Sequence, residues 1–319
     1  MMSMTDSSTT HSTDDTRDVL VIDDLRLTAD GVDGPVELVH GVHLTVREGE
    51  QVALVGESGS GKSVTARSVL RLDGDLEVQG RVIVDGADIL ALPEKAMGAV
   101  RGRKVGMVFQ DPLSALDPYR RIEQHLVPLF RARGLSRSEA REEAVALLTE
   151  LQIPDPESKM RFYPHEFSGG MMQRIVIAIA LAGDPDLIIA DEPTTALDVR
   201  VQKQVLRILS AAAARRGLAV LLITHDVGIV AGFAERVVVM FRGRIVETAP
   251  VREFFRGAVH PYSRGLLNAV PRLDSDDRLV PLDRDAIPEV AGIGAELVDI
   301  GSGHYVARSA VDTEESGAL

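Results

Sequence analysis

The first third of the chain shows two patterns of apolar residues. Apolar and polar residues alternate from residue 19 to about residue 55, with breaks at Gly and Pro, and this alternation predicts β-strands. Residues 52–55 form an apolar run that stops at Gly56, which indicates a buried strand leading into a loop. Helical spacing follows over residues 62–72. Two more strands are expected over residues 80–85 and 104–110.

Residues from about 121 to 182 have helical periodicity and few strand signals. Ser136 and Glu139 have the spacing of a capping box, in which each side chain bonds the backbone N–H of the other residue. The helix that they begin is expected to end near Leu151, because two prolines follow it. We therefore predict a helical insertion over about residues 115–182.

Strands and helices alternate again beyond residue 186. Strands are expected over residues 187–190, 218–224, 236–240 and 243–247, and helices over residues 198–216 and 226–234. This alternation predicts a largely parallel sheet with helical crossovers. A short helical piece is expected after Pro250, and a small hairpin over residues 296–307. The predicted division is a disordered tail (1–18), a main domain (19–270) and a C-terminal extension (271–319).

Composition narrows the class of protein. The 319 residues are 45% hydrophobic and only 4% aromatic, so an aliphatic core is expected. A net charge of −13 argues against a nucleic-acid partner, because phosphate neutralisation needs basic patches. The absence of cysteine excludes disulfides and cysteine-ligated clusters. With no secretory signal or bilayer-length apolar run in the sequence, any membrane role is expected to be peripheral.

A phosphate-binding loop is predicted at the pattern G-x-x-x-x-G-K-S, between a strand and a helix. It consists of Gly56, Glu57, Ser58, Gly59, Ser60, Gly61, Lys62 and Ser63, and we include Val64 in the nucleotide-binding set. Glycines let the backbone N–H groups curl around phosphates, and the helix N-terminus favours negative charge. Lys62 is expected to reach the β- and γ-phosphates, and Ser63 to bind Mg²⁺.

An acidic pair follows the apolar run 187–190. A parallel strand delivers the residues at its carboxyl end to the ligand crevice of the sheet, so Asp191 and Glu192 are expected beside the phosphate loop. Asp191 is expected to help hold Mg²⁺, and Glu192 to polarise the attacking water. A purely structural Asp-Glu pair is the alternative, which the upstream phosphate loop disfavours.

A second anion site is predicted at Ser168, Gly169 and Gly170, where a helix begins. The helix over residues 171–181 is apolar nearly all round, so it should be buried. A phosphate loop alone already explains nucleotide binding. This second surface therefore suggests that the chain faces the nucleotide of another copy or partner.

In this order and spacing, the motifs resemble those of the ATP-binding cassette (ABC) ATPases over residues 19–270. Gln110 matches the glutamine loop, which contacts Mg²⁺ in that family; Asp198, within Ala196-Leu197-Asp198, matches the loop that crosses the dimer interface. His225 matches the switch histidine that contacts the γ-phosphate. The resemblance implies a P-loop α/β cassette with a mostly parallel core sheet, an antiparallel β subdomain and an inserted α-helical subdomain. It also implies Mg-ATP held between two cassettes, with Lys62, Glu192 and His225 as the catalytic residues.

Four segments are similar to the oligopeptide/dipeptide (and nickel) importer ATPases: residues 108–118, 163–171, 191–199 and 260–267. The likeness implies an ATPase at the cytoplasmic face of the membrane, working with transmembrane permeases and, indirectly, with an extracytoplasmic solute-binding protein. A permease helix is expected in a groove near Gln110 and residues 111–118. The Met after the double glycine, Met171, is similar to the residue at this position in the first of the two paired ATPases of such systems. A heterodimer is therefore expected, with a homodimer as the alternative.

The chain departs from the family pattern at three points. Ala29 stands where many relatives have an aromatic that stacks on adenine. The C-terminal cysteines that hold an iron–sulfur cluster in some relatives are missing, and Met172 replaces a more usual Arg. Peptide import is the favoured function. The alternatives are import of nickel or another small solute, a soluble non-transport ABC ATPase, and an unrelated P-loop kinase or switch.

Overall fold

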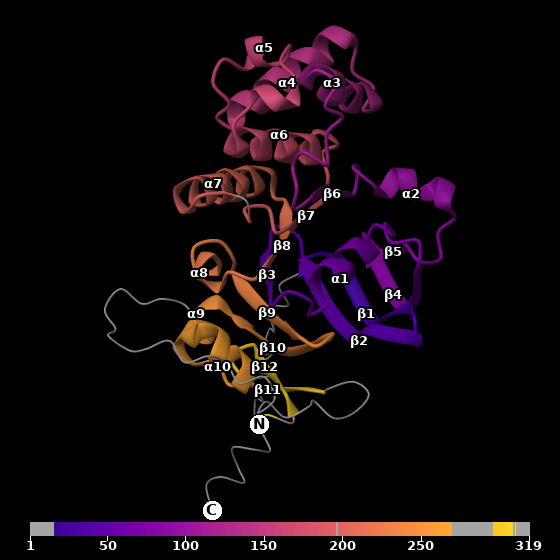
Figure 1. Ribbon diagram of the computed structural model, residues 1–319, viewed down its shortest axis with the longest axis vertical. Coiled ribbons are helices and arrows are strands. Elements are labelled where there is room, and N and C mark those ends of the chain that lie inside the picture. The colour runs from indigo at the N-terminus through magenta and orange to yellow at the C-terminus, as the bar shows by residue number, and fades with distance from the viewer. Residues whose placement is uncertain (1–15, 196, 270–295, 309, 311–319) are drawn as a thin grey trace, which may run out of the picture.

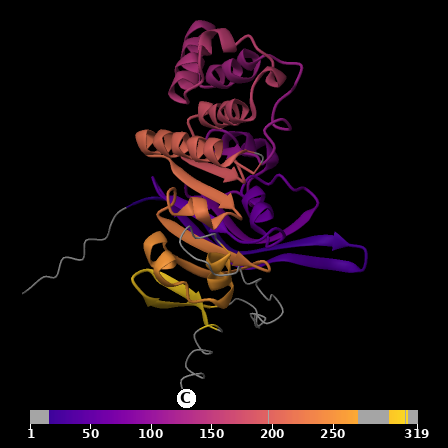
Figure 2. The same cartoon turned by 60° about the vertical axis from the view of Figure 1, so that its left-hand side comes forward.

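The computed structural model describes residues 16–195, 197–269, 296–308 and 310, so the tail predicted over residues 1–18 lies almost wholly outside the described residues. A four-stranded antiparallel sheet has the order β2-β1-β4-β5. Its strands are β1 (Asp18–Gly31), β2 (Gly34–Arg47), β4 (Leu76–Val84) and β5 (Ala87–Asp88). This sheet is the predicted antiparallel β subdomain, and it lies beside the main sheet in Figures 1 and 2.

The main sheet has eight strands in the order β11-β12-β10-β9-β3-β8-β7-β6. They are β3 (Gln51–Val55), β6 (Val105–Val108), β7 (Leu187–Asp191), β8 (Ala219–Thr224), β9 (Arg236–Phe241), β10 (Arg244–Pro250), β11 (Leu297–Gly301) and β12 (His304–Ala307). Strands β9, β3, β8, β7 and β6 pair in parallel, and the remaining three are antiparallel. The predicted α/β fold is confirmed, and the predicted hairpin extends the sheet from the C-terminal segment.

The helices outside the helical block lie close to the expected positions, with the exception of α2. They are α1 (Lys62–Ser68), α2 (Glu94–Val100), α7 (Val199–Arg216), α8 (Val227–Val230), α9 (Val251–Gly257) and α10 (Pro261–Asn268). Helices α1 and α8 are shorter than predicted, and neither α2 nor β5 was predicted. Helix α7 begins where the Asp198 carboxylate accepts two backbone N–H groups and ends at Gly217, whose φ of 62° lies in the left-handed region.

The predicted helical insertion forms one block at the top of Figure 1. It contains α3 (Ile122–Ala132), α4 (Arg137–Glu150), α5 (Pro156–Lys159), the 3₁₀ turn η1 (Pro164–Glu166) and α6 (Gly169–Ala182). The capping box at the start of α4 is confirmed: the Ser136 N–H donates to Glu139 Oε2 at 2.8 Å, and the Glu139 N–H donates to Ser136 Oγ at 3.3 Å. Helix α6 is largely buried, as its apolar surface predicts, between α3 and α4 on one side and α7 on the other.

Apolar side chains cover both faces of the main sheet, which is why its central strands are continuous apolar runs. In β8, Val220 and Leu222 pack with α6, α7 and the helical block. Leu221 and Ile223 point the other way and pack with the antiparallel sheet and α1. A third cluster joins β9 and β10 to α9 and α10. The carboxyl ends of the parallel strands are thereby held at one rigid edge.

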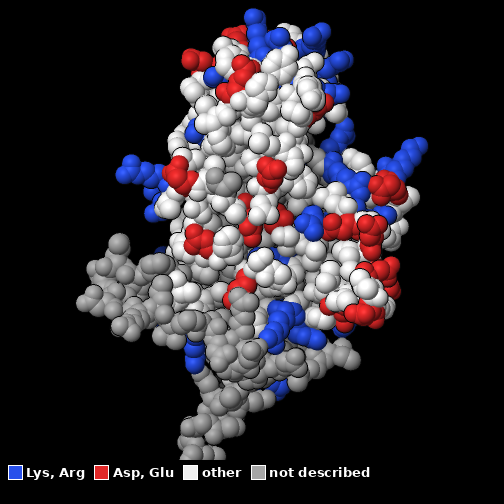
Figure 3. All heavy atoms as spheres, in the orientation of Figure 1, with Lys and Arg blue, Asp and Glu red and all other residues white. Residues whose placement is uncertain are grey.

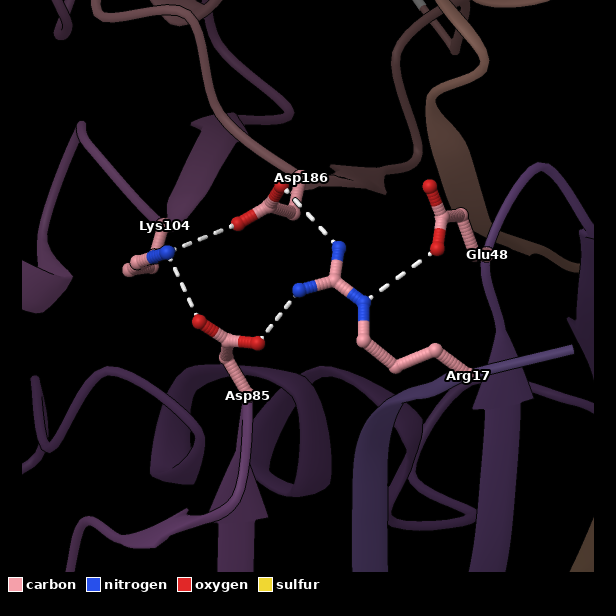
Figure 4. Close-up of polar contacts among 5 residues, drawn as sticks. All are labelled: Arg17, Glu48, Asp85, Lys104 and Asp186. Atoms are coloured by element: carbon pink, nitrogen blue, oxygen red, sulfur yellow. Dashed lines mark hydrogen bonds and ion pairs between the residues drawn. The ribbon is translucent and has the colours of Figure 1, made fainter.

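An ion cluster joins the antiparallel sheet to the edge where β6 and β7 begin, as Figure 4 shows. The Arg17 guanidinium lies 2.5 Å from Asp85, 3.3 Å from Asp186 and 3.2 Å from Glu48, and Lys104 Nζ lies 2.7 Å from Asp85 and 3.2 Å from Asp186. The hydrogen bond from Lys104 lowers the pKa of Asp85. Exposed pairs contribute about 0.2–1 kcal/mol each, so the cluster mainly fixes how the two sheets meet.

The surface charge is uneven although the net charge is −13. In Figure 3, Lys and Arg side chains gather over the helical block at the top of the view, and Asp and Glu are prominent over the antiparallel sheet at the right. Within the described ranges, no helix is both long and apolar enough to cross a membrane.

Candidate nucleotide-binding site

The predicted phosphate loop joins β3 to α1 at the carboxyl edge of the main sheet. Gly56 is required there, because a Cβ on this residue would lie 2.2 Å from the Met240 carbonyl oxygen. Gly61 has a φ of 103°, which other residues rarely adopt. The buried Lys62 ammonium donates to the carbonyl oxygens of Gly56 at 2.8 Å and of Glu57 at 2.6 Å. Burial lowers the pKa of Lys62, and nearby carboxylates partly offset this effect.

Ser63 and Asp191 meet at the start of α1. The Ser63 hydroxyl donates to Asp191 Oδ1 at 2.8 Å. Burial raises the pKa of Asp191, although the bond from Ser63 acts in the opposite direction. A hydroxyl and a carboxylate side by side are oxygen ligands of the kind that Mg²⁺ uses together with substrate phosphates. No group of three or more His, Asp or Glu residues in the described part of the chain could hold a metal alone, so phosphate or water oxygens would have to complete such a site.

Glu192 follows β7 in a strained backbone conformation. Its φ of 46° lies in the left-handed region, and its N–H donates to the Ile223 carbonyl oxygen at 3.0 Å. The carboxylate accepts hydrogen bonds from Gln110 Nε2 at 3.2 Å and from Thr195 Oγ1 at 2.8 Å, and His225 Nδ1 lies 3.2 Å away. The ends of β6, β7 and β8 therefore bring Gln110, Glu192 and His225 together.

A cavity of about 710 Å³ connects the phosphate loop to these residues. This volume lies within the usual range for small-molecule sites, about 300–1,000 Å³. The predicted site residues that line it are Glu57, Ser58, Gly59, Gly61, Lys62, Ser63, Val64, Gln110, Glu192 and His225. Asp191 lies behind this surface, in contact with Ser63. The arrangement provides donors for a triphosphate at one end and an acidic group that can accept a proton.

The other predicted phosphate surface does not line this cavity. Ser168 and Gly169 are exposed at the N-terminus of α6, and the Ser168 hydroxyl makes no capping bond to its own helix. Gly170 is buried, and a Cβ there would lie 2.4 Å from the Val201 side chain. Asp198 is used as the N-cap of α7, and Ala196 lies outside the described residues. A single chain therefore does not bring the two phosphate surfaces into one cavity.

Some residues at the cavity were not predicted from the sequence. Leu38 of β2 and Leu266 and Ala269 at the end of α10 also line it. Tyr262, the second residue of α10, accepts a hydrogen bond from the Glu57 N–H at 2.8 Å. The resemblance over residues 260–267 marked this segment but assigned it no role. Ala29 is not among the residues that line the cavity.

Two family models match the chain. Residues 39–195 match the family described as ABC transporter, and residues 246–295 match the oligopeptide/dipeptide transporter, C-terminal region. The oligopeptide transport ATP-binding protein OppD of Salmonella typhimurium is 46% identical over 263 residues, or 81% of this chain and 78% of that protein. The dipeptide transport ATP-binding protein DppD of Bacillus subtilis is 42% identical over 270 residues, or 83% and 81%.

Solved structures of cassettes have the same fold. The dimeric post-hydrolysis structure of the ATP-binding cassette MJ0796 bound to ADP and Pi has a TM-score of 0.65 and 29% identity, covering 73% of this chain and 99% of that one. The structure of cbiO1 from Clostridium perfringens, part of the ABC transporter complex cbiONQ, has a TM-score of 0.64 and 27% identity, covering 75% and 91%.

Proposed function

The chain belongs to the ABC transporter family of ATP-binding proteins, and we propose that its nucleotide site hydrolyses Mg-ATP to energise the import of oligopeptides or dipeptides. ATP binding and hydrolysis come with the family. The observation that supports the assignment of residues is the single cavity in which the phosphate loop, Gln110, Glu192 and His225 meet.

The three residues expected to be catalytic have proposed tasks in this cavity. Lys62 leaves its bonds to the loop carbonyls and neutralises the β- and γ-phosphates, while loop N–H groups bind phosphate oxygens. Glu192 accepts a proton from the water that attacks the γ-phosphorus, and the P–O bond to the leaving ADP breaks. His225, already 3.2 Å from Glu192, contacts the γ-phosphate.

Magnesium is proposed to sit beside Ser63, Asp191 and Gln110. The 2.8 Å bond between Ser63 and Asp191 supports this placement, because both oxygens can turn toward one cation. When bound, Mg²⁺ would neutralise charge that develops on the phosphates. Omission of divalent cations is expected to abolish hydrolysis, and unchanged turnover with a chelator present would contradict this site.

The base assignment is tested by Glu192→Gln with Glu57→Gln as the matched control. Both residues line the cavity and both changes remove one carboxylate, but only Glu192 is placed at the ends of β6, β7 and β8. Loss of the base is expected to lower kcat by about 100-fold or more, with ATP still bound, whereas Glu57→Gln should stay within a few-fold of the parent. Equal losses in the two variants would refute the assignment.

A second cassette is proposed to complete the site. The exposed Ser168 and Gly169 would bind the γ-phosphate held by the partner cassette, because a helix N-terminus is a ready anion site. Val199, at the start of α7, is 64% exposed and would be covered by that partner. Glu192→Gln should form ATP-dependent dimers by light scattering with its paired ATPase, or with itself if the dimer is a homodimer. Adding Ser168→Arg should prevent them.

Permease subunits are proposed to dock near Gln110 and residues 111–118, and so to hold the chain at the cytoplasmic face of the membrane. Support comes from large apolar side chains left exposed there: Phe109 is 36% exposed, Leu113 58% and Tyr119 89%. Cross-links from Leu113→Cys to a permease should form efficiently. Links found only from other surfaces would contradict the proposed groove.

Peptides are the proposed cargo because the C-terminal family match and the relatives' names both refer to oligopeptide or dipeptide transport. The test is stimulation of ATP hydrolysis in proteoliposomes that hold the permeases, the paired ATPase and the solute-binding protein. Short peptides are expected to stimulate it and nickel is not. Stimulation by nickel alone would favour the small-solute alternative.

A further inference from the structure

Helix α10 forms part of the nucleotide cavity although it lies beyond the ABC transporter match. Leu266 on this helix and Ala269 directly after it line the cavity, together with Leu38 of β2. All three side chains are apolar, unlike the charged and polar residues near Glu192. The cavity thus has an acidic, polar part and an apolar part.

Strand order places these two parts on opposite sides of the phosphate loop. The loop follows β3, which has β8 and β7 on one side and β9 and β10 on the other. Ser63 bonds Asp191 at the end of β7, so the proposed metal and γ-phosphate lie on that side. A nucleotide whose phosphates extend toward β7 has its base on the β9 side.

The apolar residues are held on the β9 side by two contacts. The N–H of His40, close to Leu38 in β2, donates to the Gly243 carbonyl oxygen in the β9–β10 turn at 2.9 Å. The ring of Tyr262 in α10 packs on Phe241, the last residue of β9, with 4.3 Å between ring centroids. Leu38 and Leu266 therefore border the cavity where the base is expected.

Helix α10 is also fixed relative to the phosphate loop. The fully buried Tyr262 hydroxyl accepts the Glu57 N–H at 2.8 Å. At the start of the helix, the buried Glu247 carboxylate accepts the N–H groups of Val259 at 2.8 Å and His260 at 3.0 Å. These buried bonds fix the helix relative to the phosphate loop and to β10, as a rigid ligand pocket requires.

We propose that Leu38 and Leu266 form the base-binding end of the nucleotide site and pack against the faces of a purine ring. This inference rests on the proposed phosphate site and adds the residues that recognise the nucleoside. Aliphatic side chains can pack on a π-face but cannot hydrogen-bond the edge of the base, so the pair gives affinity for a purine without choosing between adenine and guanine.

The test compares Leu266→Ala with Leu267→Ala in the full chain. Both leucines are partly buried neighbours on α10 and pack on the same apolar cluster, but only Leu266 lines the cavity. Calorimetry with Mg-ATP, Mg-GTP and Mg-tripolyphosphate separates base contacts from phosphate contacts. Leu266→Ala is expected to raise the Kd of both nucleotides by about tenfold, or about 1.4 kcal/mol, and to leave tripolyphosphate binding unchanged.

Three results would overturn the inference: unchanged nucleotide binding in Leu266→Ala, an equal loss of tripolyphosphate binding in that variant, or the same nucleotide loss in Leu267→Ala. Leu38→Ala should repeat the Leu266→Ala pattern, which keeps the test valid if one variant folds poorly. Failure of the underlying phosphate site has a different signature. In that case Lys62→Ala would leave both ATP and tripolyphosphate binding intact.

Discussion

Acidification is expected to destabilise the chain through His260 at the start of α10. The side chain is 2% exposed, and its Nδ1 accepts the Tyr262 N–H at 3.2 Å. Burial lowers the pKa of His260 from 6.5 to about 4, and the smaller effect of the Glu247 carboxylate opposes this. The unfolded chain thus binds a proton at this residue between pH 6.5 and about 4, whereas the folded chain does not.

The sign and size of the effect follow from this difference. The contribution of His260 is fully present above pH 6.5 and is lost as the pH falls toward 4. One pKa unit corresponds to about 1.4 kcal/mol, so the free energy of unfolding should fall by about 3 kcal/mol over this range because of His260 alone. A loss of this size is a large part of the stability of most domains, about 5–15 kcal/mol.

His260→Asn isolates this contribution. Asparagine can still accept the Tyr262 N–H as an N-cap, but it does not titrate. The smaller side chain costs stability at every pH, so the measured quantity is the difference between parent and variant in urea unfolding across the range. That difference should shrink by about 3 kcal/mol from pH 7 to pH 4. His43→Asn, at a 61% exposed side chain, is the control. Parallel pH profiles for parent and His260→Asn would refute the reasoning.

Three further substitutions test other parts of the structure. Asp191→Asn should abolish hydrolysis yet raise the Tm of the ligand-free chain at neutral pH. The raised pKa of the Asp191 carboxyl means that stability is lost as the pH rises through that pKa, so the gain in the variant should fade on acidification. A lower Tm of the variant at neutral pH would contradict this. Tyr262→Phe removes the acceptor of the Glu57 N–H and should raise the Kd of ATP by about tenfold. Tyr305→Phe, at a 39% exposed ring in β12, is the control and should leave the Kd of ATP unchanged. Gly183→Ala would place a Cβ 1.6 Å from the Gly102 carbonyl oxygen and should cost about 3 kcal/mol in chemical denaturation; no loss would show that this close approach is relaxed.

Local signals in the sequence predicted the core of the fold well. The apolar runs of β3, β7 and β8 are buried on both faces and read as strands without tertiary information. Ser136 and Glu139 marked the start of α4 because a capping box is a purely local arrangement. Short elements were missed because tertiary contacts decide them: β5 has two residues, and α2 is a seven-residue helix with Gly98 inside it.

The candidate site also contains residues that the sequence could place and residues whose position depends on tertiary contacts. Asp191 and Glu192 could be placed beside the phosphate loop because parallel strands deliver the residues at their carboxyl ends to one edge of the sheet, and Gln110 and His225 were assigned through the resemblance to ABC ATPases. Tyr262 and Leu266 could not be placed at the cavity from the sequence. Their position there depends on how α10 docks, and α10 lies far along the chain from the phosphate loop. The left-handed conformation of Glu192 was also invisible in the sequence, because glutamate has no special preference for it.

The hydrogen bonds on Glu192 have a kinetic consequence for a cassette without its partner. Gln110 and Thr195 already donate to the carboxylate, and His225 lies within 3.2 Å of it. Under the proposed role, a water molecule must displace one of these groups before it can be aligned for attack. Side-chain exchange of this kind takes nanoseconds or less, so it is a rapid equilibrium before the chemical step, and it raises the barrier of basal hydrolysis by about 1.5–3 kcal/mol, the free energy of one hydrogen bond to a charged group. Assembly with the second cassette would then accelerate the reaction by freeing the carboxylate from one of these donors.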